Sequence, residues 1–456
     1  MEYREFLESK APRAQSHGID AGPMHEALFD YQKDVTAFCL KQGRAALFLD
    51  TGLGKSACTL EWCDQAAKAS NGYALILTPL AVAKQFEREA AKFGYEARVI
   101  RDQSGVMPGI NICNYDRLDL LDASVFGAVA LDESSILKSF NGSTSRALIA
   151  SFADTPFRLC ATATPAPNDH MELGQHAEFL GIMSSQEMLA RWFINDTSTG
   201  SQQWRLKKAA VNPFWDWVAS WARAAETPED LGYDASRFVL PDMNIIRHQA
   251  FGNLQPYGDG LFMDDMSATN MFAVKRETSD ARAQAVAELV AREPLEPWLI
   301  WCDTDFESAS LASKIPNSIE VRGSMTPEKK ETAIELFLTG KVNMITKPGI
   351  AGSGLNFQIC ARMAYVGRTF SYESFYQSVR RCWRFGQTRP VDVHLIVAEG
   401  EDQIGRVIDR KAEDHKTMKR AMASAMRRNN ATESTSKIKY TPSHIGRLPS
   451  WLTSAA

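Results

Sequence analysis

The stretch AALFLDTGLGKS, residues 45–56, decides the fold of the first part of the chain. Five apolar residues predict a short buried strand, a turn with two glycines follows, and residues 57–69 have a helical pattern. Glycines let backbone N–H groups turn towards phosphate oxygens, and the N-terminus of the next helix adds positive potential. The segment therefore predicts a phosphate-binding loop (P-loop). An ordinary Gly-rich turn is the alternative, because Leu49 stands where the strict pattern has a glycine.

Short apolar runs alternate with helical patterns on both sides of a central break. The predicted strands are 45–49, 74–79, 110–113, 128–131, 157–160, 298–301, 342–346, 363–366 and 391–397. Such runs are typical of strands buried on both faces of a parallel sheet, joined by right-handed crossovers. The sequence therefore predicts an α/β protein with two tandem parallel-sheet domains and a mostly helical insertion between them.

The insertion is predicted from a change in composition. Residues 181–271 hold five of the ten tryptophans and show few α/β units. Trp217 and Trp221 lie four residues apart, which favours core packing over base stacking. The predicted domains are an N-terminal arm (1–22), a first lobe (23–180), the Trp-rich insertion (181–271), a second lobe (272–400) and a basic helix with a tail (401–456).

Composition excludes several classes of protein. The chain has 456 residues, 45% of them hydrophobic and 23% charged, as in ordinary globular proteins. With 51 basic and 55 acidic residues it is not a histone-like protein. No apolar run approaches the ~20 residues of a bilayer span, and no signal peptide is visible, so we expect a cytoplasmic protein that does not bind a membrane. Eight scattered cysteines without a C-x-x-C pair argue against a disulfide scaffold or zinc finger.

The C-terminal segment is basic although the whole chain is not. Residues 405–440 contain ten Lys or Arg and four Asp or Glu. One interpretation is a helix that adds non-specific phosphate contacts. The other is a solvated helix packed on the second lobe, because charge runs usually face water.

Two carboxylates follow the apolar run 128–131. Asp132 would hold Mg²⁺ through water, and Glu133 would polarise an attacking water. In the P-loop, Lys55 would reach the β- and γ-phosphates and Ser56 the Mg²⁺. The alternative for the acidic pair is a solvated turn at the end of a strand, which its pairing with Lys55 disfavours.

The P-loop, the Asp132-Glu133 pair and the segment Thr162-Ala-Thr164-Pro together resemble the superfamily 2 helicases, and in detail the SNF2 branch of DNA translocases. The resemblance implies two RecA-like lobes that bind ATP and Mg²⁺ between them. It also implies roles for single residues in the first lobe. Gln32 would read adenine; Thr51, Gly52 and Gly54 would bind the nucleotide with Lys55 and Ser56; Thr78 and Asn114 would contact the DNA backbone; Thr162 and Thr164 would couple hydrolysis to movement. Ser135 stands where the family usually has histidine.

The second lobe carries the longest match. Residues 377–387, QSVRRCWRFGQ, resemble SNF2 motif VI and include Gln377. Arg381 and Arg384 lie three apart, hence on one helix face, and by the resemblance would bridge to the γ-phosphate. Arg380 lies off the fixed arginine positions, so we expect it to matter less. The alternative for an Arg-rich helix is a solvated face. Upstream, the segment that contains Gly352 and Gly354 resembles motif V, whose glycines would approach both DNA and nucleotide.

Three functions remain open on this basis. The first is an ATP-driven translocase on mainly duplex DNA, of the compact type found in bacteria and their viruses. The second is a strand-separating helicase or the motor subunit of a restriction or replication-restart complex. The third is a non-catalytic nucleic-acid-binding scaffold. ATP turnover with and without duplex DNA would separate the third from the first two.

Overall fold

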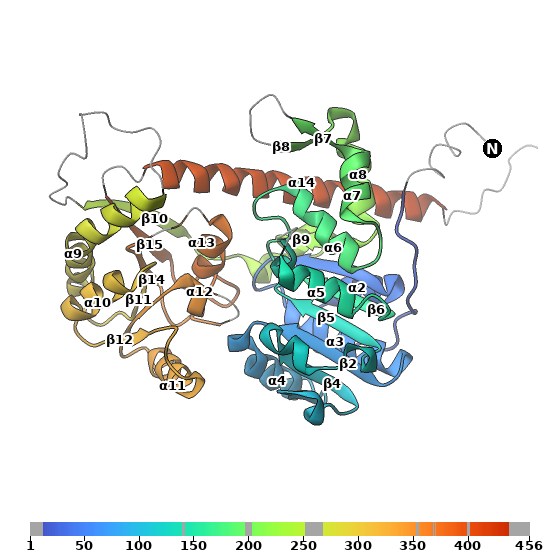
Figure 1. Cartoon of the computed structure of the whole chain (residues 1–456), viewed down its shortest axis with the longest axis horizontal. Coiled ribbons are helices and arrows are strands. Elements are labelled where there is room, and N and C mark those ends of the chain that lie inside the picture. Colours follow the sequence, from blue (N-terminus) through green and yellow to red (C-terminus); the bar gives the residue numbers. More distant parts are fainter. Residues whose placement is uncertain are drawn as a thin grey trace, which may run out of the picture.

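A computed structural model describes residues 12–138, 142–196, 203–250, 268–352, 355–367, 369, 371–398 and 402–436. Two sheets of parallel strands, each flanked by helices, form two lobes, and one long helix runs across both (Figure 1). The predicted α/β fold with two tandem RecA-like sheets is therefore confirmed.

The first lobe is built on a seven-stranded sheet in the order β3-β4-β2-β5-β6-β1-β9. Its strands are β1 (Arg44–Leu49), β2 (Tyr73–Thr78), β3 (Ala97–Val99), β4 (Gly109–Asn114), β5 (Ala128–Asp132), β6 (Phe157–Ala161) and β9 (Ala222–Ala225). Its helices are α2 (Asp30–Gln42), α3 (Lys55–Ala69), α4 (Ala83–Lys92), α5 (Ser143–Ser151), α6 (Leu173–Phe179), α7 (Ser185–Trp192) and α8 (Val211–Ala219). The central strands are almost wholly buried because one hydrophobic cluster lies on each face of the sheet.

The second lobe contains a six-stranded sheet in the order β10-β15-β14-β11-β13-β12. Its strands are β10 (Met243–Ala250), β11 (Trp298–Trp301), β12 (Ser318–Val321), β13 (Asn343–Thr346), β14 (Arg362–Tyr365) and β15 (Val391–Ala398). Its helices are α9 (Ala268–Arg292), α10 (Asp305–Lys314), α11 (Pro327–Leu338), α12 (Pro348–Ala351) and α13 (Tyr372–Val379). All pairings in both large sheets are parallel, so the ends of the strands that carry site residues gather at one edge of each sheet.

The Trp-rich segment 181–271 contributes to both lobes. Its strand β9 pairs with β1, and its strand β10 pairs with β15. A separate antiparallel pair joins β7 (Phe193–Asp196) to β8 (Gln203–Leu206). Four tryptophans are buried in the first-lobe core: Trp192, Trp215, Trp217 and Trp221. Trp204 packs against that core, so all five agree with the prediction of core packing. The domain boundaries at 180 and 271 remain predictions.

The long helix α14 (Asp402–Ser436) leaves the second lobe and lies along the first, next to α8 and β9 (Figure 1). Met418, Met422 and Met426, spaced four apart, are buried in the first-lobe core. Near the start of the helix, Ile408 packs on Tyr372 of the second lobe. The basic segment therefore has an apolar face that joins both lobes, which neither sequence interpretation expected. Among the described helices, none combines the length and apolar character needed to cross a bilayer.

Candidate nucleotide site

The P-loop lies between β1 and α3, with its glycines in conformations that other residues rarely adopt. Gly52 has φ +94° and Gly54 has φ +78°. Helix α3 begins at Lys55, so its free N–H groups face the loop. The Nζ atom of Lys55 donates to the carbonyl oxygens of Leu49 and Asp50, at 2.9 and 3.4 Å. Burial lowers the pKa of Lys55, and the carboxylate of Glu133 opposes this effect. The ammonium therefore lies inside the loop, as phosphate binding requires.

Gln32 lies directly behind this loop. Its Nε2 donates to the carbonyl of Leu53 at 3.0 Å, and its Oε1 accepts from the N–H of Phe29 at 3.0 Å. A Cβ on Gly54 would come within 2.2 Å of the Gln32 amide nitrogen, so this position requires glycine. Gln32 thus holds the P-loop. Its predicted contact with adenine remains a prediction.

Asp132 ends β5 beside the P-loop, and Glu133 directly follows the strand. Burial, followed by the charge of Glu133, raises the pKa of Asp132 to about 7. Glu133 has φ +53°, a conformation that is strained for a residue with a long side chain. The hydroxyl of Thr162 donates to Glu133 Oε2 at 3.4 Å, which links the residue predicted to couple hydrolysis to the predicted base.

Thr78 contacts the acidic pair. Its side chain is fully buried and its hydroxyl donates to Asp132 Oδ2 at 2.9 Å. Its predicted contact with the DNA backbone remains a prediction. Asn114, the other residue expected to contact DNA, ends β4 and is also buried.

The residues predicted to hold Mg²⁺ have suitable chemistry. Ser56 and Asp132 supply a hydroxyl and a carboxylate, and Mg²⁺ prefers oxygen ligands. The described residues contain no cluster of three or more His, Cys, Asp or Glu that could cage a metal.

The arginines of motif VI follow α13 of the second lobe. Arg381 donates from Nε to the carbonyl of Gln377 at 2.9 Å and from NH1 to the carbonyl of Leu355 at 3.2 Å. Arg384 NH1 also donates to Leu355, at 3.4 Å, while its buried Nε has no partner within the described part of the chain. Burial and the neighbouring charge of Arg381 lower the pKa of Arg384 to about 10. An orphaned guanidinium nitrogen is consistent with a site for an anion.

Arg381 lies close to the first-lobe site although it is more than 300 residues from Lys55 in sequence. Burial lowers the pKa of Arg381, and the first-lobe carboxylates Glu133 and Asp132 act against that shift. A Cβ on Gly52 would lie 3.0 Å from the backbone nitrogen and Cβ of Phe385. Glycine is therefore needed at Gly52 because the second lobe comes so close.

Polar side chains also connect the lobes next to this point. The Nε2 of Gln377 donates to the Thr164 hydroxyl at 3.4 Å, and Thr164 in turn donates to Glu373 at 3.5 Å. Lys138 of the first lobe forms an ion pair with the same Glu373. Thr164 and Gln377, which the sequence places in different motifs, therefore meet at the lobe interface.

Two further predictions have different outcomes. Gly352 directly follows α12 as its C-cap, and a Cβ there would lie 2.2 Å from the Pro348 carbonyl oxygen, so the close turn requires glycine. Gly354 lies outside the described residues.

Arg380, which we expected to matter less, is instead buried and ion-paired with Asp50 of the first lobe. That expectation considered only the spacing of the motif and could not include a partner 330 residues away.

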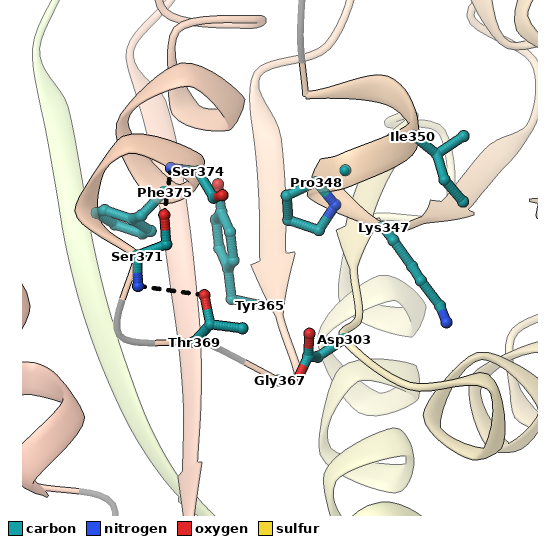
Figure 2. A pocket seen from close by; sticks show the side chains of 11 residues that line it. Asp303, Lys347, Pro348, Ile350, Tyr365, Gly367, Thr369, Ser371, Ser374 and Phe375 are labelled. Carbon is teal, nitrogen blue, oxygen red and sulfur yellow. Dashed lines mark hydrogen bonds between the residues drawn. The ribbon is translucent and has the colours of Figure 1, made fainter. Parts of the chain in front are cut away.

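A pocket in the second lobe has no counterpart among the sequence predictions. It has a volume of about 230 Å³ and lies where β11, β13 and β14 end, beside the start of α13 (Figure 2). Lys347 and the hydroxyl residues Thr369, Ser371 and Ser374 line it, together with the carboxylate of Asp303. These residues cannot be recognised from the sequence, because single hydroxyl residues at strand ends have no spacing pattern.

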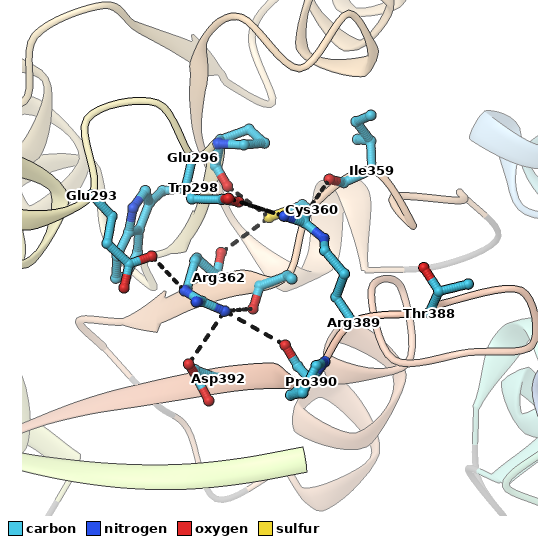
Figure 3. A network of polar contacts seen from close by, with 12 residues as sticks. Glu293, Glu296, Trp298, Ile359, Cys360, Arg362, Thr388, Arg389, Pro390 and Asp392 are labelled. Carbon is cyan, nitrogen blue, oxygen red and sulfur yellow. Dashed lines mark hydrogen bonds and ion pairs between the residues drawn. The ribbon is translucent and has the colours of Figure 1, made fainter. Parts of the chain in front are cut away.

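The end of motif VI has a structural role within the second lobe. Gln387 Nε2 donates to the carbonyl oxygens of Gln358 and Cys360, at 3.0 and 3.2 Å. Next to it, Arg389 pairs with Glu296 at 2.8 Å, in the polar network of Figure 3. These contacts fix the loop after the arginines and do not involve the P-loop.

Fold and site together comprise two parallel-sheet lobes, with a P-loop and an acidic pair in one lobe and paired arginines in the other. Residues 281–386 match the family described as helicase conserved C-terminal domain. The predicted resemblance to helicases is therefore confirmed, and the second lobe contains the matched domain. Among solved structures, the Sulfolobus solfataricus SWI2/SNF2 ATPase core in complex with dsDNA is similar. It has 17% sequence identity and a TM-score of 0.42, and the match covers 89% of this chain and 96% of that one.

Proposed function

We propose that this protein is an SNF2-like translocase that hydrolyses ATP between its lobes and moves along mainly duplex DNA. We further propose that it works in the cytoplasm of bacterial or virus-infected bacterial cells. The observation that carries the proposal is the meeting of two half-sites. The P-loop and the Asp132–Glu133 pair come from one lobe, and Arg381 of the other lobe lies close enough for its charge to interact with those carboxylates.

Each residue has a definite part in this chemistry. Lys55 and the N-terminus of α3 neutralise phosphate charge, and Mg²⁺, held by Ser56 and Asp132, would add further charge stabilisation. Glu133 orients and deprotonates the attacking water. Arg381 and Arg384 stabilise the charge that develops on the transferred phosphoryl group.

Movement follows from the division of the site between lobes. A nucleotide with its γ-phosphate favours closure because it offers charge to both half-sites, and hydrolysis removes that bridge. Thr162 and Thr164 are placed to transmit the change: the first contacts Glu133, the second Gln377.

DNA binding is supported by features outside the nucleotide site. The second-lobe pocket has several hydroxyls at the carboxyl ends of parallel strands, where such folds bind ligands (Figure 2), and it is also lined by Lys347, whose ammonium is ion-paired with Asp305 at 2.8 Å. The exposed face of α14 adds Arg410, Lys416 and Arg420. Phosphates are the ligands that such groups contact without reading sequence.

The test is steady-state ATP hydrolysis with duplex, forked and single-stranded DNA and with RNA. We expect duplex DNA to stimulate turnover most, and Lys55→Ala to abolish it in a folded protein. Absence of ATP turnover with every nucleic acid would overturn the proposal in favour of a binding scaffold. Stimulation by forked or single-stranded DNA alone would favour strand separation over duplex translocation.

A further inference from the structure

The side chain of Asp50, the residue before Thr51 of the P-loop, contacts residues of the second lobe and of α14. Its Oδ2 forms an ion pair with Arg380, which directly follows α13, and its Oδ1 accepts a hydrogen bond from the hydroxyl of Tyr376. The Nζ of Lys419 on α14 lies 3.7 Å from Oδ2. The side chains of Asp50, Arg380 and Lys419 are only 5–7% exposed.

The charges in this cluster balance. Lys419 also lies 3.6 Å from Glu226, so two cations face two carboxylates. Burial alone would raise the pKa of Asp50, but Arg380 and Lys419 hold that pKa well below its usual range. Asp50 is therefore a buried carboxylate, and its ionised form is stabilised by partners from the second lobe and from α14. Removal of one partner would leave an uncompensated buried charge.

The cluster is connected to both halves of the nucleotide site by single peptide units. On one side, Asp50 Oδ1 accepts from the N–H of Thr51 at 2.6 Å, and the Asp50 carbonyl accepts from Lys55 Nζ at 3.4 Å. On the other side, Arg380 directly precedes Arg381. A shift of the carboxylate relative to Arg380 would therefore move the arginine pair relative to the P-loop.

Helix α14 fixes the third member of the cluster. Lys419 lies between Met418 and Met422, both buried in the first-lobe core, whereas Ile408 of the same helix packs on the second lobe. The helix thus carries Lys419 to Asp50 while it is anchored on both lobes.

We propose that Arg380 and Lys419 are positioning residues that act through Asp50 to seat the arginines of motif VI on the P-loop, with α14 as the strap that joins the lobes. The inference rests on the proposed ATPase function. In this arrangement Arg380 does not touch the nucleotide. It sets the position from which Arg381 and Arg384 act.

The first test compares kcat and KM for ATP in Arg380→Met, Arg384→Ala and the double variant. We expect Arg380→Met to lower kcat at least tenfold while KM for ATP changes less than threefold. In the double variant, Arg384→Ala should reduce kcat much less than it does alone. Without Arg380, Arg384 is already out of position and contributes little to kcat, so its removal changes little. An unchanged kcat in Arg380→Met, or effects that simply multiply, would overturn the inference. If Arg380→Met fails to fold, Asp50→Asn with Arg380→Gln removes both charges and should show the same loss of kcat; wild-type kcat in that variant would overturn the inference.

The second test measures lobe closure without nucleotide. All eight native cysteines are buried, so dyes can be attached selectively to cysteines introduced at the exposed positions Lys92 and Lys329. We expect Arg380→Met and Lys419→Met to broaden the interlobe FRET distribution. The matched control is Lys84→Met, which breaks an exposed pair across the lobes, 2.9 Å from Glu331, and should leave both FRET and kcat unchanged. The inference fails if all three variants behave like wild type.

The proposed ATPase function and the positioning role of Arg380 can be refuted separately. If Lys55→Ala abolishes turnover while Arg380→Met retains wild-type kcat, only the positioning role is wrong. If the wild-type protein hydrolyses no ATP, the proposed function is wrong, and the FRET measurement still decides whether the Asp50 cluster holds the lobes together.

Discussion

The backbone of Glu133 allows a test of strain stored at the site. Its φ of +53° lies in the left-handed region, which costs a residue with an ordinary side chain about 1–2 kcal/mol and asparagine less. Glu133 also raises the pKa of Asp132, so its charge adds repulsion. Two substitutions separate these effects. Glu133→Gln removes the charge and keeps the strain, and Glu133→Asn removes the charge and relieves much of the strain.

We expect Glu133→Asn to be more stable than Glu133→Gln by about 1 kcal/mol, the part of the left-handed cost that asparagine avoids. Both should slow ATP hydrolysis by about 10²-fold or more, because neither retains the carboxylate. The assay is urea denaturation followed by tryptophan fluorescence, read in the transition of the first lobe because two lobes need not unfold together.

The chain supplies a mirror control in the second lobe. Asn317 is the other non-glycine residue with positive φ in the described part of the chain, at +52°. Asn317→Gln should therefore destabilise the second lobe by about 1 kcal/mol or more, since it also loses the hydrogen bond to the Lys341 carbonyl. Equal stabilities of the two Glu133 variants, with a clear loss in Asn317→Gln, would refute stored strain at Glu133.

Two further predictions concern α14. Met422→Ala should lower stability by about 2–3 kcal/mol, because it leaves a cavity in the first-lobe core, whereas Ser424→Ala on the exposed face should change it by less than about 0.5 kcal/mol. Urea denaturation checks both, and equal effects would show that the helix does not dock as described. Lys416→Ser with Arg420→Ser should reduce the slope of log K for duplex DNA against log salt by up to about 1.8, whereas Lys68→Ser should not. An unchanged slope would mean that this face does not contact phosphates.

Local patterns predicted most of the fold. The strands that consist almost entirely of apolar residues coincide with the apolar runs in the sequence. The reason is that strands buried on both faces must be apolar throughout. Six strands were not predicted, since short or half-exposed strands lack that pattern: β3, β7, β8, β9, β10 and β12. The apolar face of α14 was obscured by its basic composition, although Met418, Met422 and Met426 repeat at helical spacing.

At the site, motif spacing identified residues but not all of their contacts. The P-loop forms the predicted strand–turn–helix because that feature is local. The arginine pair was expected on one helix face, but α13 ends at Val379, so Arg381 and Arg384 lie in the turns that follow it. The contact of Thr78 with Asp132 was not predicted, since sequence does not show which way a strand-end side chain points. The Asp50–Arg380 pair depends on two residues that only the folded lobes bring together.

The most direct test of the central claim measures DNA-stimulated ATP hydrolysis in Arg384→Ala, Arg384→Lys and Arg389→Ala. Arg384 can act on a nucleotide held by Lys55 only if the two lobes share one site. We predict that Arg384→Ala lowers kcat by about 10³-fold or more with a much smaller change in nucleotide Kd, and that Arg384→Lys restores little because an ammonium lacks the planar fork. Arg389→Ala, which loses the pair with Glu296 and a hydrogen bond to the Ile359 carbonyl, both away from the P-loop, should retain wild-type kcat (Figure 3). If Arg384→Ala is as mild as Arg389→Ala, the two lobes do not form a shared catalytic site and the account is wrong.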